Sequence, residues 1–259
     1  MTFLDCRDLE TALGSLSEAL QLDAHEFRAT LLDFDDSRLV DSEHEDTCMQ
    51  MPRELLARLG RDVNAVKIDG VFYFHGTRTI APESFRCDGI LPLDQMVERI
   101  WSTLYELVRD ECSRSEWTDF RRAVETDAGG HGGYLYRLKA RDRLHFGPYA
   151  LLVREIFFDP TATGSHDYLG CPEIVQDIAS CYRHARGVNL ERRFCEASQP
   201  AIVKFQSADV WQGSLPTALW YVYTKLRNDE LTSTANGGFD GHGNAVPPQD
   251  VIAVEVIPG

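Results

Sequence analysis

One stretch constrains the fold more than any other, and it spans residues 71–78. Its first half, residues 71–74, reads Val-Phe-Tyr-Phe, and β-branched and aromatic side chains suit a packed strand. His75, Gly76 and Thr77 follow directly. A ring nitrogen, a glycine that lets a ligand approach the backbone and a hydroxyl together suit a binding site. We therefore expect a buried strand that ends in a ligand site, with a strand running into an ordinary turn as the alternative.

The composition is that of a globular protein, and the charge excludes some partners. The chain has 259 residues and a net charge of -15, which opposes general affinity for nucleic acid or anionic membranes. No apolar run approaches the roughly 18 residues that span a bilayer. The seven cysteines are scattered without a CxxC pair, which predicts reduced thiols and no metal site. No signal peptide is visible, so we expect a cytoplasmic protein without a membrane partner.

The pattern predicts two parts, a helical acidic segment at residues 1–62 and a main domain at residues 63–259. In the first part, Leu9, Leu13, Leu16 and Leu20 share one helical face. Asp23 followed three residues later by a glutamate predicts the start of a second helix. We expect this segment to cap the core of the main domain, with a partner-binding module as the alternative.

The main domain alternates strands and helices without a regular βαβ period, which predicts an α+β fold. Helices are expected from Asp94 and at residues 116–125, so that residues 94–126 form a helical insertion. Another helix is expected after Pro172, and residues 217–226 favour a helix over a strand. Expected strands, besides the one at 71–74, lie at residues 134–138, after the Phe146-Gly-Pro turn, at residues 201–205 and at residues 251–257. Residues 236–244 are rich in glycine and predict a loop.

Residues 74–90 resemble the first NAD-binding motif of the ADP-ribosyltransferases of the diphtheria-toxin and poly(ADP-ribose) polymerase type. That motif places an aromatic residue before His-Gly-Thr, then a Ser-apolar pair, then a Gly-apolar turn. Phe74 and the triplet at 75–77 match its start, and Ser84-Phe85 and Gly89-Ile90 match its later parts. The resemblance implies a split antiparallel sheet of the ADP-ribosyltransferase type, preceded by the N-terminal helical segment.

The resemblance also implies roles for individual residues. His75 would bind a ribose hydroxyl of NAD, the backbone of Gly76 would pair with the nicotinamide carboxamide, and Thr77 would support the pocket. Tyr149, in Gly-Pro-Tyr-Ala, would stack on the nicotinamide, and Tyr168 resembles the second tyrosine of the motif. Tyr134 and Tyr136 compete with Tyr149 for its role.

The third element implied by the resemblance is a carboxylate that stabilises positive charge as nicotinamide leaves. Glu255, in the terminal strand, is the candidate, and period-2 alternation places it either in the pocket or at the solvent edge. In the family the glutamate stands at the start of its strand, where this chain has Gln249 and Asp250. The loop before the strand, at residues 236–244, often touches the target, so Phe239, Asp240 or His242 could contact an acceptor.

The resulting prediction is an NAD-dependent ADP-ribosyltransferase that transfers ADP-ribose to a protein, nucleic-acid or small-molecule acceptor. By family analogy it would act as a bacterial toxin or effector. One alternative is an inactive member of the fold that binds a nucleotide or a partner, which the missing strand-start glutamate favours. Another is an RNA 2′-phosphotransferase-like enzyme, which needs a basic pocket from Arg78 and the basic run at residues 137–143.

Overall fold

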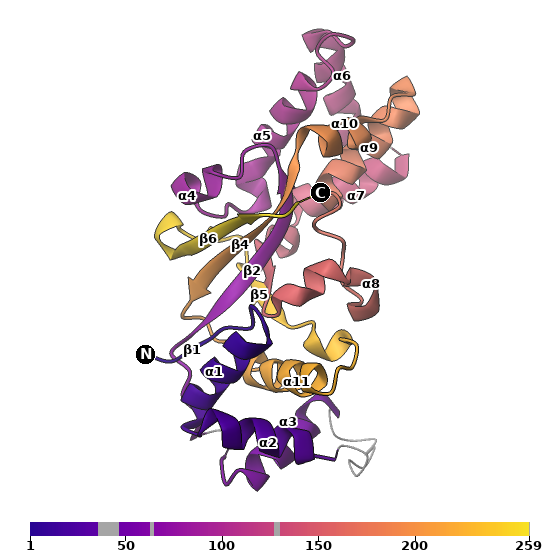
Figure 1. Cartoon of the computed structure of the whole chain (residues 1–259). Helices are drawn as coiled ribbons and strands as arrows, with labels where there is room; N and C mark the ends of the chain where they lie inside the picture. The colour runs from indigo at the N-terminus through magenta and orange to yellow at the C-terminus, as the bar shows by residue number, and fades with distance from the viewer. Residues whose placement is uncertain (36–46, 63–64, 127–129, 259) are drawn as a thin grey trace. The chain divides into compact units, whose positions relative to one another are not determined.

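The computed structural model describes residues 1–35, 47–62, 65–126 and 130–258, and these form an α+β fold around a mixed β-sheet (Figure 1). This confirms the predicted α+β class, and the ADP-ribosyltransferase type of the sheet stays a prediction. The strands are β1 (Phe3–Leu4), β2 (Gly70–Thr79), β3 (Tyr149–Leu151), β4 (Gln199–Ser207), β5 (Gly238–Asp240) and β6 (Val251–Val256). Their order is β5-β3-β2-β4-β6, with β1 parallel to β2 and outside this path. β2 and β3 are antiparallel, with Phe74 opposite Leu151.

The chain divides into two compact units, and the boundary falls inside β2, β3, β4 and β5. Unit 1 comprises residues 1–74, 150–166 and 205–239, and unit 2 comprises residues 75–149, 167–204 and 240–259. The helical N-terminal segment therefore belongs to unit 1, together with two later stretches of the chain.

The helices of unit 1 are α1 (Leu9–Leu20), α2 (Ala24–Asp33), α3 (Thr47–Arg58), α8 (Pro160–Thr163) and α11 (Ser214–Leu226). Of these, α1, α2 and α3 pack against the apolar helix α11, beside which Figure 1 draws them. Leu13, Leu16 and Leu20 are buried, so the predicted apolar face of α1 is confirmed. The Asp23 carboxylate accepts hydrogen bonds of 3.0 Å from the backbone N–H groups of His25 and Glu26, which confirms it as the N-cap of α2.

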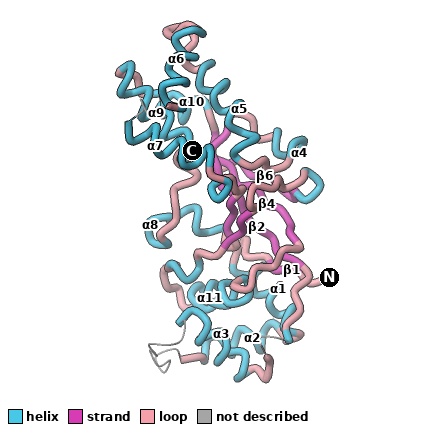
Figure 2. Tube along the Cα trace, turned by 180° about the vertical axis from the view of Figure 1, so that it is seen from behind, coloured by secondary structure: helices cyan, strands magenta, loops and turns pink. Residues whose placement is uncertain are grey.

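Unit 2 contains a helical cluster whose members lie side by side in both views (Figures 1 and 2). They are α5 (Leu93–Glu106), α6 (Arg114–Glu125), α7 (Gly130–Arg141), α9 (Glu173–Arg186) and α10 (Leu190–Ala197), and the short α4 (Ser84–Asp88) precedes them. An aromatic core that includes Trp101, Trp117 and Tyr182 joins these helices. The helix predicted from Asp94 begins one residue earlier, because the extended Pro92 is its N-cap.

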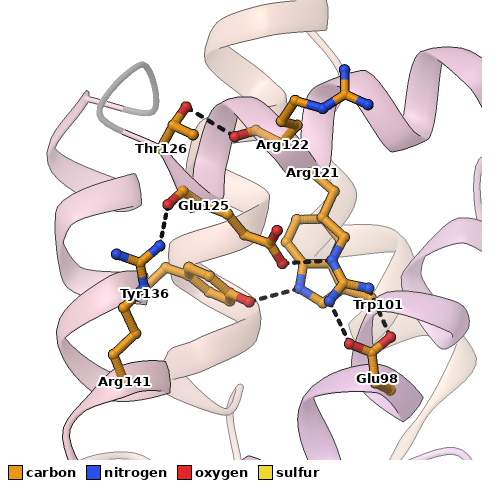
Figure 3. A network of polar contacts seen from close by, with 8 residues as sticks. All are labelled: Glu98, Trp101, Arg121, Arg122, Glu125, Thr126, Tyr136 and Arg141. Atoms are coloured by element: carbon orange, nitrogen blue, oxygen red, sulfur yellow. Dashed lines mark hydrogen bonds and ion pairs between the residues drawn. The ribbon is translucent and has the colours of Figure 1, made fainter.

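The strand predicted at residues 134–138 is wrong, because those residues belong to α7. Tertiary contacts outweigh the local β preference of the aromatic residues there. Tyr136 is buried in the helical core and accepts a 2.9 Å hydrogen bond from the indole N–H of Trp101 (Figure 3). Arg137 and Arg141 donate to backbone carbonyls at the C-terminal end of α6, where helix carbonyls lack partners. These two arginines of the basic run therefore serve helix packing.

The prediction that the strand ends before His75 is also wrong, because β2 continues to Thr79. The Arg78 guanidinium fixes the strand by donating to the hydroxyl of Ser198 at 3.0 Å and to the carbonyls of Cys195 at 2.7 Å and Leu169 at 3.2 Å. These bonds anchor the end of β2 within unit 2, so the chain stays extended past the polar triplet.

The structure also bears on the predicted terminal strand, on the cysteines and on whether a helix could span a membrane. The terminal strand is present as β6. The cysteines at positions 6, 87, 112, 171, 181 and 195 are free thiols. Among the residues that the structure describes, each helix is either too short or too polar to cross a bilayer.

Candidate functional site

The registers of β2, β3 and β5 bring three predicted residues into one row across the sheet. Because Phe74 is opposite Leu151 in an antiparallel pair, Tyr149 lies opposite Gly76 two positions further along. On the other side of β3, the N–H of Gly241 donates a 3.0 Å hydrogen bond to the carbonyl of Pro148. This bond places Asp240 opposite Tyr149. Residues directly opposite one another project from the same face, so Gly76, Tyr149 and Asp240 share a face of the sheet.

The pKa shift of Tyr149 agrees with the position of Asp240 opposite it in the row. Burial raises the pKa of the Tyr149 hydroxyl, and the negative charge of Asp240 and the neighbouring hydroxyl of Tyr168 raise this pKa further. Burial also raises the pKa of Tyr168, and the charge of Glu173 adds to the effect. Tyr149 and Asp240 are therefore cross-strand neighbours beside Gly76, which is buried and has no side chain to fill the space. Tyr168 lies within electrostatic range of Tyr149.

Tyr149 itself is held in place while part of its ring stays open to solvent. Its hydroxyl donates a 2.5 Å hydrogen bond to the carbonyl of Leu144. Its ring lies over Gly147, where an added Cβ would come within 3.2 Å of two ring carbons, and Gly147 has a φ of +59°. A side chain at position 147 would therefore displace the ring. The residue remains 40% exposed, which leaves aromatic surface for stacking on a planar ligand.

His75 contacts Tyr149 through the backbone. Successive strand residues point to opposite faces, so the His75 side chain projects from the face opposite to Gly76 and Tyr149. Its Nδ1 lies 2.7 Å from the carbonyl oxygen of Tyr149, which can only accept, so Nδ1 carries the proton and Nε2 is an acceptor. Burial lowers the pKa of the His75 imidazole, and the bond to Tyr149 partly offsets this effect. Thr77 is half-buried on the same face as His75.

The later parts of the motif support His75 and join it to the chain that follows the glycine-rich loop. The ring of Phe85, in α4, meets the His75 ring edge-on at 6.2 Å. Ile90 forms a bridge with Val246 through two hydrogen bonds of 2.9 Å. Gly89 has a φ of +74°, and a Cβ there would lie 2.0 Å from the carbonyl oxygen of Val246. The close approach of two backbones explains the Gly-apolar pair.

Glu255 is not brought to the row. It is exposed on β6, at the opposite edge of the sheet from β5, and β4 and β2 lie between β6 and β3. With neighbouring strands about 4.8 Å apart, β6 is roughly 14 Å from the strand of Tyr149. Asp250 ends a 3₁₀ turn directly before β6, at the same edge. The carboxylate that the structure places beside Tyr149 is Asp240.

Sequence reasoning considered Asp240 only as an acceptor contact within a glycine-rich loop. Residues 238–240 form β5, so the expected loop contains a strand. Phe239 packs in unit 1 against Tyr73 and Phe205, with ring centroids 5.3 and 5.2 Å apart. The three residues of β5 are too few to show the alternating pattern that predicts a strand. β5 forms because it pairs with β3, which is distant in the sequence. Tyr134 and Tyr136, the competitors of Tyr149, both lie on α7.

The arginines that a phosphate pocket would need have other partners. Arg78 uses four hydrogen bonds on the hydroxyl and carbonyl of Ser198 and on the carbonyls of Cys195 and Leu169. Two grooves lie elsewhere: one of about 390 Å³ beside Trp101 and Arg121 in unit 2, and one of about 780 Å³ beside Trp211 in unit 1. Within the described residues, no cluster of three His, Cys, Asp or Glu side chains is arranged to hold a metal ion.

Comparison of the chain with known proteins finds no matching family model, no matching curated protein and no matching solved structure. The evidence for a function is therefore the geometry of the row formed by Gly76, Tyr149 and Asp240, together with the motif at residues 74–90.

Proposed function

We propose that the protein is an NAD-dependent ADP-ribosyltransferase whose site is the row formed by Gly76, Tyr149 and Asp240, with Tyr168 beside it. The observation that carries the proposal is the position of Tyr149. It lies between a glycine and a carboxylate on one face of the sheet, and a second tyrosine is close enough to raise its pKa. An aromatic surface, a glycine backbone without a side chain over it and a negative charge are the groups that the proposed nicotinamide cleavage uses.

Each residue has a role in this reaction. The exposed ring of Tyr149 stacks on the nicotinamide, and the backbone of Gly76 pairs with the carboxamide, as the motif implies. His75 projects from the other face of the sheet, so its role here is to hold the Tyr149 backbone through Nδ1. When the C1″–nitrogen bond breaks, the electron pair leaves with nicotinamide and the ribose gains positive charge. The Asp240 carboxylate stabilises that charge electrostatically.

A second candidate, an inactive nucleotide-binding protein, is favoured by the state of Asp240. Its Oδ1 accepts a 2.8 Å hydrogen bond from the backbone N–H of His242, and its Oδ2 lies 3.2 Å from the Nδ1 of the same residue. A carboxylate with both oxygens engaged has less freedom to meet a substrate. RNA 2′-phosphotransferase chemistry finds less support, because the guanidinium of Arg78 already uses four hydrogen bonds on protein oxygens.

The test incubates the purified chain with NAD and measures nicotinamide by chromatography and NAD affinity by calorimetry. Removing the ring in Tyr149→Ala should lower nicotinamide release by 10-fold or more, whereas Tyr149→Phe should retain most of it. The matched control is Tyr134→Ala, which removes an exposed tyrosine of α7 and should leave release unchanged. NAD binding without release would favour the inactive protein. A wild-type chain that fails both to bind NAD and to release nicotinamide would contradict the proposal.

A further inference from the structure

The glycine-rich loop after β5 holds a histidine against the site carboxylate. His242 Nδ1 lies 3.2 Å from Asp240 Oδ2, and the backbone N–H of His242 donates to Oδ1 at 2.8 Å. The His242 side chain is 77% exposed. Its Nε2 has no hydrogen-bond partner among the residues that the structure describes. The carboxylate therefore orients an imidazole whose other nitrogen faces solvent.

The loop that carries His242 is fixed on both sides of the histidine. The N–H of Gly241 donates to the carbonyl of Pro148 at 3.0 Å, and the N–H of Gly243 donates to the carbonyl of Gly147 at 2.7 Å. These acceptors directly precede Tyr149. The guanidinium of Arg143 donates to the carbonyl of His242 at 3.3 Å. His242 is thus attached to the segment that leads into the stacking tyrosine.

The backbone of His242 is in an uncommon conformation, with a φ of +49°. Residues other than glycine rarely adopt left-handed φ values, and such values persist where surrounding contacts enforce them. Here the two glycine hydrogen bonds and the Arg143 contact enforce the conformation. The loop thereby turns the imidazole back toward Asp240 instead of leaving it as an unrestrained surface side chain.

We propose that His242, oriented by Asp240, is the general base that activates the acceptor nucleophile. This inference rests on the proposed function. Asp240 Oδ2 lies 3.2 Å from Nδ1, and a proton on Nδ1 facing this carboxylate leaves the lone pair on Nε2. Exposure of Nε2 places that lone pair where an acceptor enters from solvent. The same carboxylate then stabilises both the imidazolium that forms and the positive charge on the ribose.

With water as the acceptor, the C1″–nitrogen bond of NAD breaks and its electron pair leaves with nicotinamide. The water oxygen forms a bond to C1″, and one water proton moves to Nε2 of His242, from which it passes to solvent. The products are ADP-ribose, nicotinamide and one proton. No oxidant, reductant or metal is required, and general bases of this kind contribute about 10²- to 10⁴-fold in rate.

The test removes the His242 imidazole and then supplies a nucleophile that reacts without losing a proton to a base. His242→Gly preserves the positive φ and leaves space, and His242→Asn tolerates the same conformation. Both should lower nicotinamide release from NAD in water by about 10²-fold or more, with KM for NAD within 2-fold of wild type. Sodium azide, which is already an anion, should restore release in His242→Gly by at least 10-fold, with ADP-ribosyl azide identified by mass spectrometry.

Two variants serve as controls. His184→Ala removes an exposed histidine at the end of α9 and should change neither release nor its response to azide. Asp240→Asn should lose activity that azide does not restore, because the charge on the ribose remains without its partner. Full activity of both His242 variants, or a loss that azide does not restore, would overturn the role of His242 while leaving the proposed function intact.

A measurement without turnover separates the two proposals. Nitrogen NMR of the His242 ring should show the proton on Nδ1, and Asp240→Asn should shift the tautomer balance. A proton on Nε2 in the wild type would overturn the proposed base whatever the activity. Absence of nicotinamide release from the wild-type chain would reject the proposed function and the base together, even with the expected tautomer.

Discussion

The indole N–H of Trp101 donates a 2.9 Å hydrogen bond to the hydroxyl of Tyr136, and both residues are at most 3% exposed. The bond joins α5 to α7 inside the aromatic core of unit 2. Figure 3 shows it beside the ion pairs of Arg121 with Glu98 and Glu125. A buried indole N–H that loses its acceptor remains without a partner, and this cost exceeds the net value of the bond itself.

We therefore expect Tyr136→Phe to lower the free energy of unfolding by about 1–3 kcal/mol. Urea denaturation followed by tryptophan fluorescence measures the change. Tyr134→Phe, at an exposed position of the same helix, should alter stability by less than about 0.5 kcal/mol. Equal effects of the two substitutions would show that the buried hydrogen bond does not stabilise the helical cluster.

The choice of catalytic carboxylate gives a second prediction. Asp240→Asn should reduce nicotinamide release by about 10²- to 10³-fold, because a carboxylate beside the developing charge is replaced by a neutral amide. Glu255→Gln, on the far edge strand, should leave release within 2-fold of wild type. Steady-state assays with NAD compare the two variants. A larger loss in Glu255→Gln would return the catalytic role to the terminal strand.

Gly89 provides a third prediction, about the fold that supports the motif. Gly89→Ala should destabilise the chain by about 1–3 kcal/mol, because a non-glycine residue at φ +74° is strained and its Cβ would approach the Val246 carbonyl to 2.0 Å. Gly14→Ala is the control. Gly14 lies within α1 with nothing within 4 Å of an added Cβ, so alanine should stabilise the helix by roughly 0.5–1 kcal/mol. Urea denaturation should show shifts of opposite sign.

The lowered pKa of His75 predicts a dependence of stability on pH. Burial keeps the folded-state pKa below its ordinary value of about 6.5, so the unfolded chain binds the proton more readily. The stabilisation is complete above pH 6.5 and is lost as the pH falls from there toward the folded-state pKa. In His75→Asn, which keeps an N–H donor for the Tyr149 carbonyl, the melting temperature should fall less between pH 7.5 and 5.5. An identical fall in both proteins would contradict the prediction.

The amino-acid sequence alone predicts the helices and strands that depend on interactions between residues close together in the chain. The leucine stripe of α1, the Asp23 cap of α2 and the Val-Ile-Ala-Val run of β6 specify helix or strand through side-chain spacing and capping. The motif resemblance named His75, Gly76 and Tyr149 as site candidates, and their roles stay predictions. The predictions of these helices and strands succeed because the interactions involved join residues a few positions apart.

Long-range tertiary contacts set two outcomes: Asp240 is the carboxylate beside Tyr149, and residues 134–138 are helical. Asp240 lies in a three-residue strand that exists through its pairing with β3, about ninety positions earlier in the chain. Tyr136 is helical because its side chain meets Trp101 in the core of the helical cluster. Both outcomes depend on contacts between residues distant in the sequence, and such contacts override local propensity and leave no periodic trace.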